Sequence, residues 1–102
     1  MIVLIVTYVA KEGREARLEE RLREMTRLTR REPGCIDYRF WSATDDPNAI
    51  LLFEQWQERQ ALETHLAAPH TAAFLAQIGP AVDGTLELTR FEVSDHGPLF
   101  GR

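Results

Sequence analysis

Hydrophobic residues follow two different spacings in the first third of this chain. Residues 2–10 form an almost unbroken apolar and β-branched run, which predicts a strand covered on both faces. From residue 15 to 31 the spacing becomes helical, and one apolar stripe runs between glutamates and arginines. That stripe consists of Leu18, Leu22, Met25 and either Leu28 or Thr29. Pro33 and Gly34 come next and predict the end of the helix.

The next two segments predict an antiparallel hairpin. Residues 35–41 alternate, and residues 50–56 resume a strand after a turn cluster at residues 45–48. In the first strand, the residues expected on one face are Ile36, Tyr38 and Phe40. In the second, the expected faces are Ile50, Leu52, Glu54 and Trp56 on one side, and Leu51 and Phe53 on the other.

The last part of the chain predicts two helical pieces and a strand. Residues 57–68 are helical until Pro69 interrupts them, and the second piece ends before Gly79 and Pro80. The inward positions are expected to be Ala61, Leu62, His65 and Leu66, then His70, Ala73, Phe74 and Ile78. Residues 82–93 alternate as a final strand. The tail of residues 94–102 is expected to be ordered only if something holds it.

This β-α-β-β-α-β order predicts an α+β, ferredoxin-like (split βαβ) sandwich with a four-stranded antiparallel sheet and helices on one face. A chain of 102 residues has room for one such domain, with a core over about residues 2–93. Large apolar residues occupy both faces of the strands, so a monomer would expose one row as a patch. A symmetric homodimer is the simplest way to cover that patch.

Composition narrows the possible partners and location. The chain carries a net charge of −4 with no basic block, which argues against nucleic acid as a partner. The apolar start lacks a positively charged flank and is interrupted at Lys11, so neither a signal peptide nor a membrane span is expected. Cys35 is the single cysteine, which precludes an intramolecular disulfide and fits a reducing compartment. We therefore expect a cytoplasmic protein.

The strong catalytic and metal-binding motifs are absent, and His65 is the residue of most interest. His65 and His70 are five residues apart across a proline, which is an unsuitable spacing for two ligands on one helical face, so no metal is predicted. His65 faces the predicted sheet. It is either a half-buried histidine satisfied by a backbone carbonyl or a tyrosine, or a proton acceptor or donor at a pocket wall.

Other side chains could line such a pocket. The aromatic candidates suit either a flat aromatic ligand or a plain core, and they are Tyr38, Phe40, Phe53, Trp56 and Phe74. Thr7 offers a hydroxyl near the same rim. His70 is a candidate contact as well, although a structural role at a helix entrance is the simpler interpretation. Cys35 has no evident activating base, so a nucleophilic role is not expected.

Several motifs together resemble one known family. They are Glu32-Pro33-Gly34-Cys35 leading into Tyr38-Arg39-Phe40, Asp45-Asp46-Pro47-Asn48, Phe53-Glu54-Gln55-Trp56, and the run from Ala61 to His70. This set is similar to the antibiotic biosynthesis monooxygenase (ABM) domain family, in particular to its quinol monooxygenase-like members. The matching motifs lie between Glu32 and Phe74, and the element order matches over roughly residues 2–93.

The resemblance implies a dimeric α+β barrel whose last strand or tail often clasps the partner, and a pocket between the helices and the sheet. It also implies oxidation of a small quinol or phenol by O₂ without metal, flavin or nicotinamide. His65 is then the candidate catalytic, proton-handling residue, with Tyr38, Thr7 and Trp56 as possible hydrogen-bonding partners. A haem-degrading branch uses Asn, Trp and His where this sequence has Thr7, His65 and Leu75, so haem degradation is disfavoured.

Two other functions fit the same expected pocket. One is a non-catalytic small-ligand-binding or stress-associated domain that keeps the fold. The other is a non-oxidative isomerase or cyclase that acts on aromatic intermediates. The monooxygenase is favoured by the frequency of that activity in the family that the sequence resembles.

Overall fold

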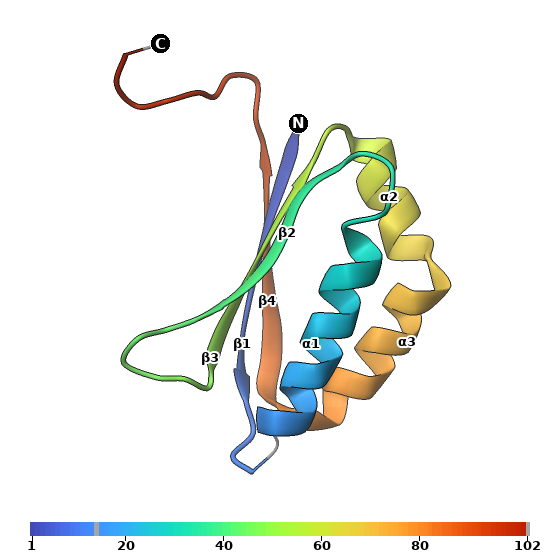
Figure 1. The fold of residues 1–102 in the computed structure, drawn as a ribbon, viewed down its shortest axis with the longest axis vertical. Helices are drawn as coiled ribbons and strands as arrows, with labels where there is room; N and C mark the ends of the chain where they lie inside the picture. Colours follow the sequence, from blue (N-terminus) through green and yellow to red (C-terminus); the bar gives the residue numbers. More distant parts are fainter. Residues whose placement is uncertain (14, 102) are drawn as a thin grey trace.

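The structure is a computed structural model that describes residues 1–13 and 15–101. Its elements are β1 (Ile2–Ala10), α1 (Glu15–Thr29), β2 (Cys35–Ser42), β3 (Ala49–Trp56), α2 (Arg59–Ala67), α3 (Pro69–Ile78), the 3₁₀ turn η1 (Gly79–Ala81) and β4 (Val82–Glu92). The predicted α+β order is confirmed, with α2 and α3 as the two pieces of the second helical region (Figure 1).

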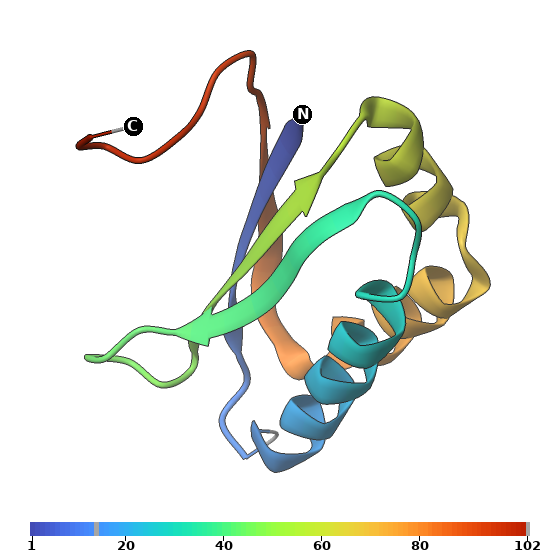
Figure 2. The same ribbon diagram turned by 45° about the horizontal axis from the view of Figure 1, so that its top comes forward.

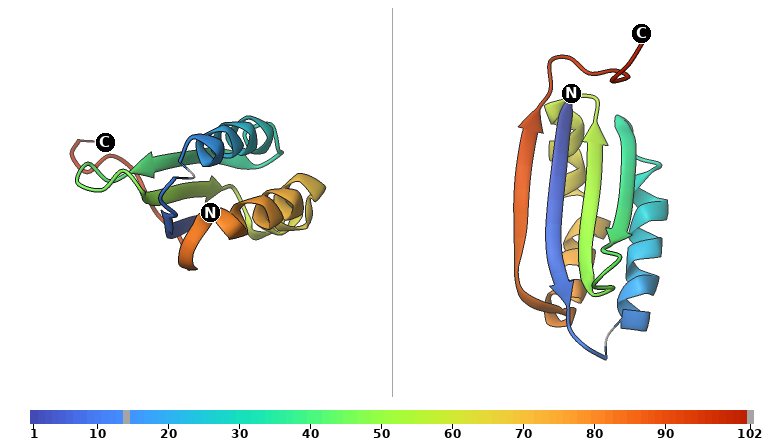
Figure 3. Two further views of the ribbon diagram at one scale, coloured as in Figure 1. Left: turned by 90° about the horizontal axis from the view of Figure 1, so that it is seen from below. Right: turned by 90° about the vertical axis from the view of Figure 1, so that its left-hand side faces the viewer.

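The four strands form one antiparallel sheet in the order β2-β3-β1-β4. This is the strand order of the predicted ferredoxin-like fold, in which the first and third strands are central. All the helices lie behind the sheet when it is seen face-on (Figure 3, right). The sheet therefore has an inner face, toward the helices, and an outer face.

The core lies between the inner face and the helices. Alternate residues of β1 and β3 point inward, and Trp56 at the end of β3 is completely buried. The helical stripe predicted for α1 is confirmed, and Thr29 rather than Leu28 is its fully buried last member. Tyr38 of β2 is also buried against this cluster.

The alternation predicted for β2 is broken at its start. The pairing with β3 shifts between Cys35 and Asp37, so Ile36 is an extra residue in the ladder. Tyr38 and Phe40 face inward as predicted, but Ile36 is exposed, and Cys35 pairs with Trp56 and packs against the core instead. A bulge of this kind moves every side chain before it to the other face.

The inward faces of α2 and α3 also differ from the prediction. Leu66 and Ala73 are exposed, whereas Thr71 is buried. Ala68 has an extended backbone between the two helices, so each helix presents its own buried stripe. The buried residues are Leu62 and His65 in α2 and Thr71, Phe74 and Ile78 in α3. They recur every three or four positions, so each stripe is narrower than the predicted one.

The outer face is apolar, and no helix in the described part of the chain covers it (Figures 2 and 3). Its half-buried or exposed apolar residues are Val3, Ile5, Val9, Trp41, Leu51, Phe53 and Phe91. Glu54 belongs to the opposite, inner row and is buried. The row left open is thus the one that contains Leu51 and Phe53.

The tail leaves the end of β4 and points away from the helices (Figure 1). The backbone amide of Val93 donates to the carbonyl of Met1 at 2.9 Å, which extends the β1–β4 ladder by one pair. Beyond it, Leu99 and Phe100 are exposed. Arg102, the last residue of the predicted tail, lies outside the described residues. None of the described helices has both the length and the apolar character that a membrane crossing requires.

Gly34 joins the turn after α1 to the start of α2. Its φ is +84°, which favours glycine, and a Cβ built there would lie 2.5 Å from the Cβ of Ala61. The carbonyl of Gly34 accepts a hydrogen bond of 2.9 Å from the amide of Gln57. The turn and α2 therefore approach each other so closely that no side chain fits between them.

We predict that Gly34→Ala destabilises the fold by about 2–4 kcal/mol, through the left-handed backbone and the clash with Ala61 together. Urea unfolding measures the change. Gly84→Ala is the matched control, because Gly84 has a φ of +83° but open space around it. Equal losses of stability for the two variants would show that the contact with Ala61 contributes nothing. Ala61→Gly added to Gly34→Ala should recover only the part of the lost stability that the clash with Ala61 causes.

Candidate functional site

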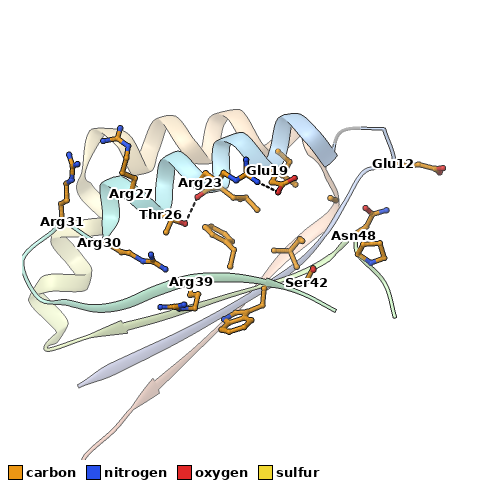
Figure 4. Close-up of a pocket in the computed structure, with 17 residues that line it drawn as sticks. Glu12, Glu19, Arg23, Thr26, Arg27, Arg30, Arg31, Arg39, Ser42 and Asn48 are labelled. Carbon is orange, nitrogen blue, oxygen red and sulfur yellow. Dashed lines mark hydrogen bonds and ion pairs between the residues drawn. The ribbon is translucent and has the colours of Figure 1, made fainter. Parts of the chain in front are cut away.

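A cleft of about 1110 Å³ lies between α1 and the hairpin of β2 and β3, which we call the α1–β2 cleft (Figure 4). The residues that line it are Ala10, Glu12, Leu18, Glu19, Leu22, Arg23, Thr26, Arg27, Arg30, Arg31, Arg39, Phe40, Trp41, Ser42, Pro47, Asn48 and Ile50. The cleft forms here because β2 is an edge strand and α1 packs beside it. Its size is that of a small-molecule site.

The floor of the cleft is apolar. Leu18 and Leu22 of α1 and Ile50 of β3 also belong to the core or pack against it, and Phe40 of β2 lies between them. Trp41 is more than half exposed at the rim. A flat apolar ligand would bury these side chains further, which favours its binding.

Arginines dominate the polar wall. Arg23 pairs with Glu19 at 2.7 Å and Arg27 pairs with Glu24 at 2.8 Å, both on the exposed side of α1. Arg30, just after α1, donates from Nε to the carbonyl of Tyr38 at 3.0 Å. That bond fixes the arginine against β2 and leaves its terminal nitrogens for other partners.

A second polar group is buried next to the cleft, around His65 of α2. The imidazole is 2% exposed, and its Nδ1 lies 2.6 Å from Oε2 of Glu32. Its ring stacks at a tilt on Trp56, with 4.8 Å between centroids, and contacts Tyr38 at 5.7 Å. Because a carboxylate only accepts, Nδ1 carries the hydrogen in this bond. Two interpretations of His65 follow from the sequence: a histidine whose hydrogen bonds are satisfied, and a proton-handling group at a pocket wall. Its burial is that of a satisfied histidine, and its partner is Glu32.

Burial lowers the pKa of His65, although the hydrogen bond to Glu32 acts against this shift. His65 is therefore held in the neutral form more firmly than a histidine in water. Its other nitrogen, Nε2, lies 3.8 Å from Oε1 of Glu54. A neutral imidazole with Nδ1–H presents a lone pair at Nε2, which is the form that accepts a proton.

Glu54 is a carboxyl group in an apolar strand. It is 3% exposed and accepts a hydrogen bond of 3.0 Å from the indole of Trp56. Burial raises the pKa of Glu54 to about 7, and the hydrogen bond from Trp56 only partly offsets this. The carboxyl thus changes its protonation state near neutral pH.

His70 also reaches this group, contrary to the expectation from its spacing. Its Nε2 lies 3.3 Å from Oε1 of Glu32, and one ligand atom from each of Glu32, His65 and His70 falls within 4.8 Å of the others. The break at Ala68 turns α3 so that both rings face Glu32. These residue types could hold a metal such as zinc, but in this structure Nδ1 of His65 and Oε2 of Glu32 are joined by their hydrogen bond.

The structure brings together most of the predicted site residues, but not in one pocket. Trp56 and Tyr38 contact His65, and Phe74 contacts Phe40 with 6.2 Å between ring centroids. Of the predicted residues, only Phe40 lines the α1–β2 cleft.

Two predicted residues lie elsewhere. Thr7 and Phe53 are on the outer face, because side chains alternate along β1 and β3. Thr7 lines a smaller hollow at the end of the sheet and cannot bond to His65. The expected pocket between helices and sheet therefore lacks both.

Sequence comparison identifies the family. The model of the family described as "Antibiotic biosynthesis monooxygenase" matches residues 1–77. The chain belongs to this family. The match spans β1 to nearly the end of α3, and so includes the His65 group and all the residues that line the cleft.

Solved structures with the ABM fold agree with the family assignment. Rv0793 from Mycobacterium tuberculosis, named "Putative monooxygenase Rv0793", is 27% identical over 88 residues, which is 86% of each chain. Its structure superposes with a TM-score of 0.87 and covers 95% of this chain and 98% of that one. A structure from Deinococcus radiodurans, named "putative antibiotic biosynthesis monooxygenase", has a TM-score of 0.91 at 26% identity and covers 99% of this chain and 100% of that one.

A third relative is longer than this chain. The protein sll1783 of Synechocystis, described as uncharacterized, is 30% identical over 67 residues. The match covers 66% of this chain but only 46% of that protein. The match thus spans about half of the length of this relative.

Sequence reasoning missed two groups of residues in this ABM domain. The partner of His65 is Glu32, which lies just before the Pro33-Gly34 turn and far from α2 in sequence. The cleft arginines fit an ordinary solvated helix face when only the periodicity of residues 15–31 is considered. Two signals were available: Glu54, a charge inside an apolar strand, and the surplus of arginines over glutamates at the end of α1.

We predict that Glu54→Gln stabilises the ABM domain at pH 8 by about 1–3 kcal/mol and by less than about 1 kcal/mol at pH 5. Folding raises the carboxyl pKa from 4.5 to about 7. The folded state therefore binds more protons than the unfolded state between these values, and the contribution of Glu54 to stability falls as the pH rises through them. Glutamine keeps an acceptor for Trp56 and cannot ionise.

Urea unfolding between pH 5 and pH 8 measures this difference. Glu63→Gln, an exposed site on α2, is the control and should leave the pH profile unchanged, because that side chain is in water in both states. A Glu54→Gln gain of the same size at pH 5 and pH 8 would show that ionisation of the buried carboxyl is not its cause.

Proposed function

We propose that this protein is a monooxygenase that oxidises a small quinol or phenol with O₂, and that the substrate binds in the α1–β2 cleft. The observation that carries the proposal is the cleft itself, with an apolar floor around Phe40 and a cationic wall, in a chain of the antibiotic biosynthesis monooxygenase family. The names of the relatives support the reaction class.

The reaction needs no outside reductant. One quinol and one O₂ give a hydroxyquinone and one water: the substrate loses four electrons, one oxygen atom enters the ring and the other leaves as water. The quinol first loses a phenolic proton, because the anion gives an electron to O₂ more readily than the neutral quinol. We therefore propose a reaction without metal, flavin or nicotinamide, in which the protein supplies binding and charge stabilisation.

The cleft has groups suited to each step. The arginine wall would stabilise the phenolate and the reduced oxygen species, since cations beside an apolar floor act more strongly than in water. We propose His65 as the proton acceptor, in the neutral form that its burial favours. The ring of Tyr38 lies between His65 and Phe40, so the proton would need a carrier, either the Tyr38 hydroxyl or a water molecule.

We expect the protein to consume O₂ above the autoxidation background with at least one member of a panel of hydroquinones and naphthols, with EDTA present. Thr26→Trp, at the centre of the cleft, should reduce kcat/KM by about tenfold or more because the indole fills the substrate volume. Gln77→Trp, an equal change at an exposed site on α3, should have no effect. An oxygen electrode measures both. Binding of these compounds without O₂ consumption would rule out the proposed reaction.

The same assay separates the role of His65 from that of the cleft. His65→Gln keeps a hydrogen-bond donor toward Glu32 but cannot take up a proton in the neutral range. We expect it to lower kcat more than it raises KM. Activity that survives His65→Gln unchanged would remove the proton-acceptor role and leave the cleft proposal intact.

We further propose that the protein acts as a homodimer joined through the outer face. The face carries Leu51 and Phe53 on a central strand, and no helix of the described chain covers it. Burying such a patch against a second copy is the usual solution for a one-sided sheet.

Sedimentation at micromolar concentration should give a mass near twice 11.7 kDa. Phe53→Glu should shift it to 11.7 kDa, because it places a charge in the proposed interface. Leu66→Glu, at an exposed site on the helical side, is the control and should stay dimeric. A wild-type mass near 11.7 kDa would overturn the homodimer proposal.

A further inference from the structure

Three side chains of metal-binding types meet where the turn after α1 approaches α2 and α3. Glu32 lies in that turn, His65 is on α2 and His70 is in the first turn of α3. One nitrogen or oxygen atom of each lies within 4.8 Å of the others. Because the two histidines come from different helices, their spacing of five residues does not keep them apart. Two imidazoles and one carboxylate are a ligand set that zinc accepts, with water as a fourth ligand.

The Nε2 atom of His70 lacks a hydrogen-bond partner. It is buried and bonds to none of the described residues. Oε1 of Glu32 is 3.3 Å away, which is within ion-pair distance, but the direction between the two atoms is not that of a hydrogen bond. A buried ring nitrogen is normally hydrogen-bonded, and leaving it without a partner costs free energy. A cation bound to this nitrogen would supply the missing contact.

The carboxyl groups around His65 also lack a full positive charge. Nδ1 of His65 is 2.6 Å from Glu32, and its Nε2 is 3.8 Å from Glu54. In the part of the chain that the structure describes, no lysine or arginine lies within ion-pair distance of either carboxyl group. Buried carboxylates are normally paired with a cation or bound to a metal. A divalent ion at Glu32 would provide that charge.

The hydrogen bond between His65 and Glu32 is compatible with a metal ion in the same place. In a tetrahedral zinc site with bonds of about 2.0–2.1 Å, the ligand atoms lie about 3.3 Å apart. Nε2 of His70 is 3.3 Å from Glu32, and Nδ1 of His65 is 2.6 Å from it. Movements on the order of 1 Å would therefore bring the three ligand atoms to these distances, with the ion in place of the hydrogen on Nδ1.

Glu54 occupies the position that an acceptor takes behind a metal-bound histidine. With a metal on Nδ1, the ring hydrogen of His65 is on Nε2, and Oε1 of Glu54 is 3.8 Å from that nitrogen. A small movement of the carboxyl group would close a hydrogen bond. Carboxylates in this position fix the orientation of the imidazole and strengthen metal binding.

We propose that Glu32, His65 and His70 form a binding site for a divalent transition-metal ion such as zinc. The ion would join the turn after α1 to both α2 and α3. The side chains of Glu32 and His70 are 15% and 28% exposed, which leaves a path from solvent and room for a water ligand. This ion takes no part in the proposed oxidation. With the ring hydrogen on Nε2, His65 could no longer accept a proton there.

The test is a calorimetric titration of ZnCl₂ into the 102-residue chain after removal of metals with EDTA and dialysis. We expect one ion per chain with a Kd of about 1 μM or lower. MgCl₂ should show no saturable binding, because magnesium prefers oxygen ligands and retains its water. The absence of saturable zinc binding would overturn the inference.

His70→Gln removes one ligand from a partly exposed position and should weaken zinc binding by about a hundredfold or more. His96→Gln is the matched control, because His96 is the remaining histidine of the chain and is exposed in the tail. It should leave the affinity unchanged. An unchanged affinity for His70→Gln, or an equal loss for His96→Gln, would overturn the inference.

Urea unfolding shows whether His70→Gln acts through the metal and not through the fold. With EDTA present, the variant and the wild type should unfold at similar urea concentrations. Zinc should raise the unfolding midpoint of the wild type alone, since an ion that binds only the folded state stabilises it. An equal rise for His70→Gln would contradict the proposed ligand set.

These measurements use no substrate and are independent of catalysis. Tight zinc binding without O₂ consumption by any quinol would remove the proposed reaction and keep the metal site. O₂ consumption by a protein that does not bind zinc would keep the reaction and remove the metal site.

Discussion

The hydrogen bond between Glu32 and His65 holds together the two halves of the helical layer. Glu32 lies in the turn that ends α1 and starts β2, and His65 lies on α2. At 2.6 Å in a buried setting this bond is short, and Gly34 against Ala61 brings the backbones close beside it. The turn is thereby fixed to α2 rather than left as a surface loop.

The candidate site depends on that attachment. The turn carries Arg30, and the next strand carries Arg39 and Phe40, so both walls of the α1–β2 cleft start from the same anchored segment. If the turn moved away from α2, α1 and β2 would change their separation. The buried polar group thus supports the cleft, and Tyr38 links the two through its ring contact with Phe40 and through the hydrogen bond that its carbonyl accepts from Arg30.

The fold could be predicted from sequence because each element is marked by its own local pattern. The apolar run of residues 2–10, the stripe ending at Thr29 and the Pro33-Gly34 stop each indicate an element without reference to the rest of the chain. One error arose where the backbone departs from a regular repeat, because the bulge at Ile36 changes which face the start of β2 presents. The errors at Leu66 and Ala73 have another cause: the buried stripe of a short helix is narrower than its run of apolar residues.

The site was less predictable, because its contacts join residues far apart in the chain. Glu32 meets His65 across 33 positions, and no local spacing encodes that pairing. The cationic character of the cleft depends on arginines of α1 and of the turn after it lying beside the apolar floor, which only the packing determines. A count of charges along the sequence gives a mildly acidic protein and conceals a positive site.

Glu54 has two protonation states in a neutral solution of this protein. A carboxyl group with a pKa of about 7 is protonated in some molecules and ionised in others at neutral pH. Glu54 is buried, bonded to the indole of Trp56 and close to His65. The protonated and ionised molecules therefore differ by one charge inside the core and not on the surface. A neutral solution of this protein is therefore a mixture of two electrostatic species, which exchange by taking up or releasing one proton.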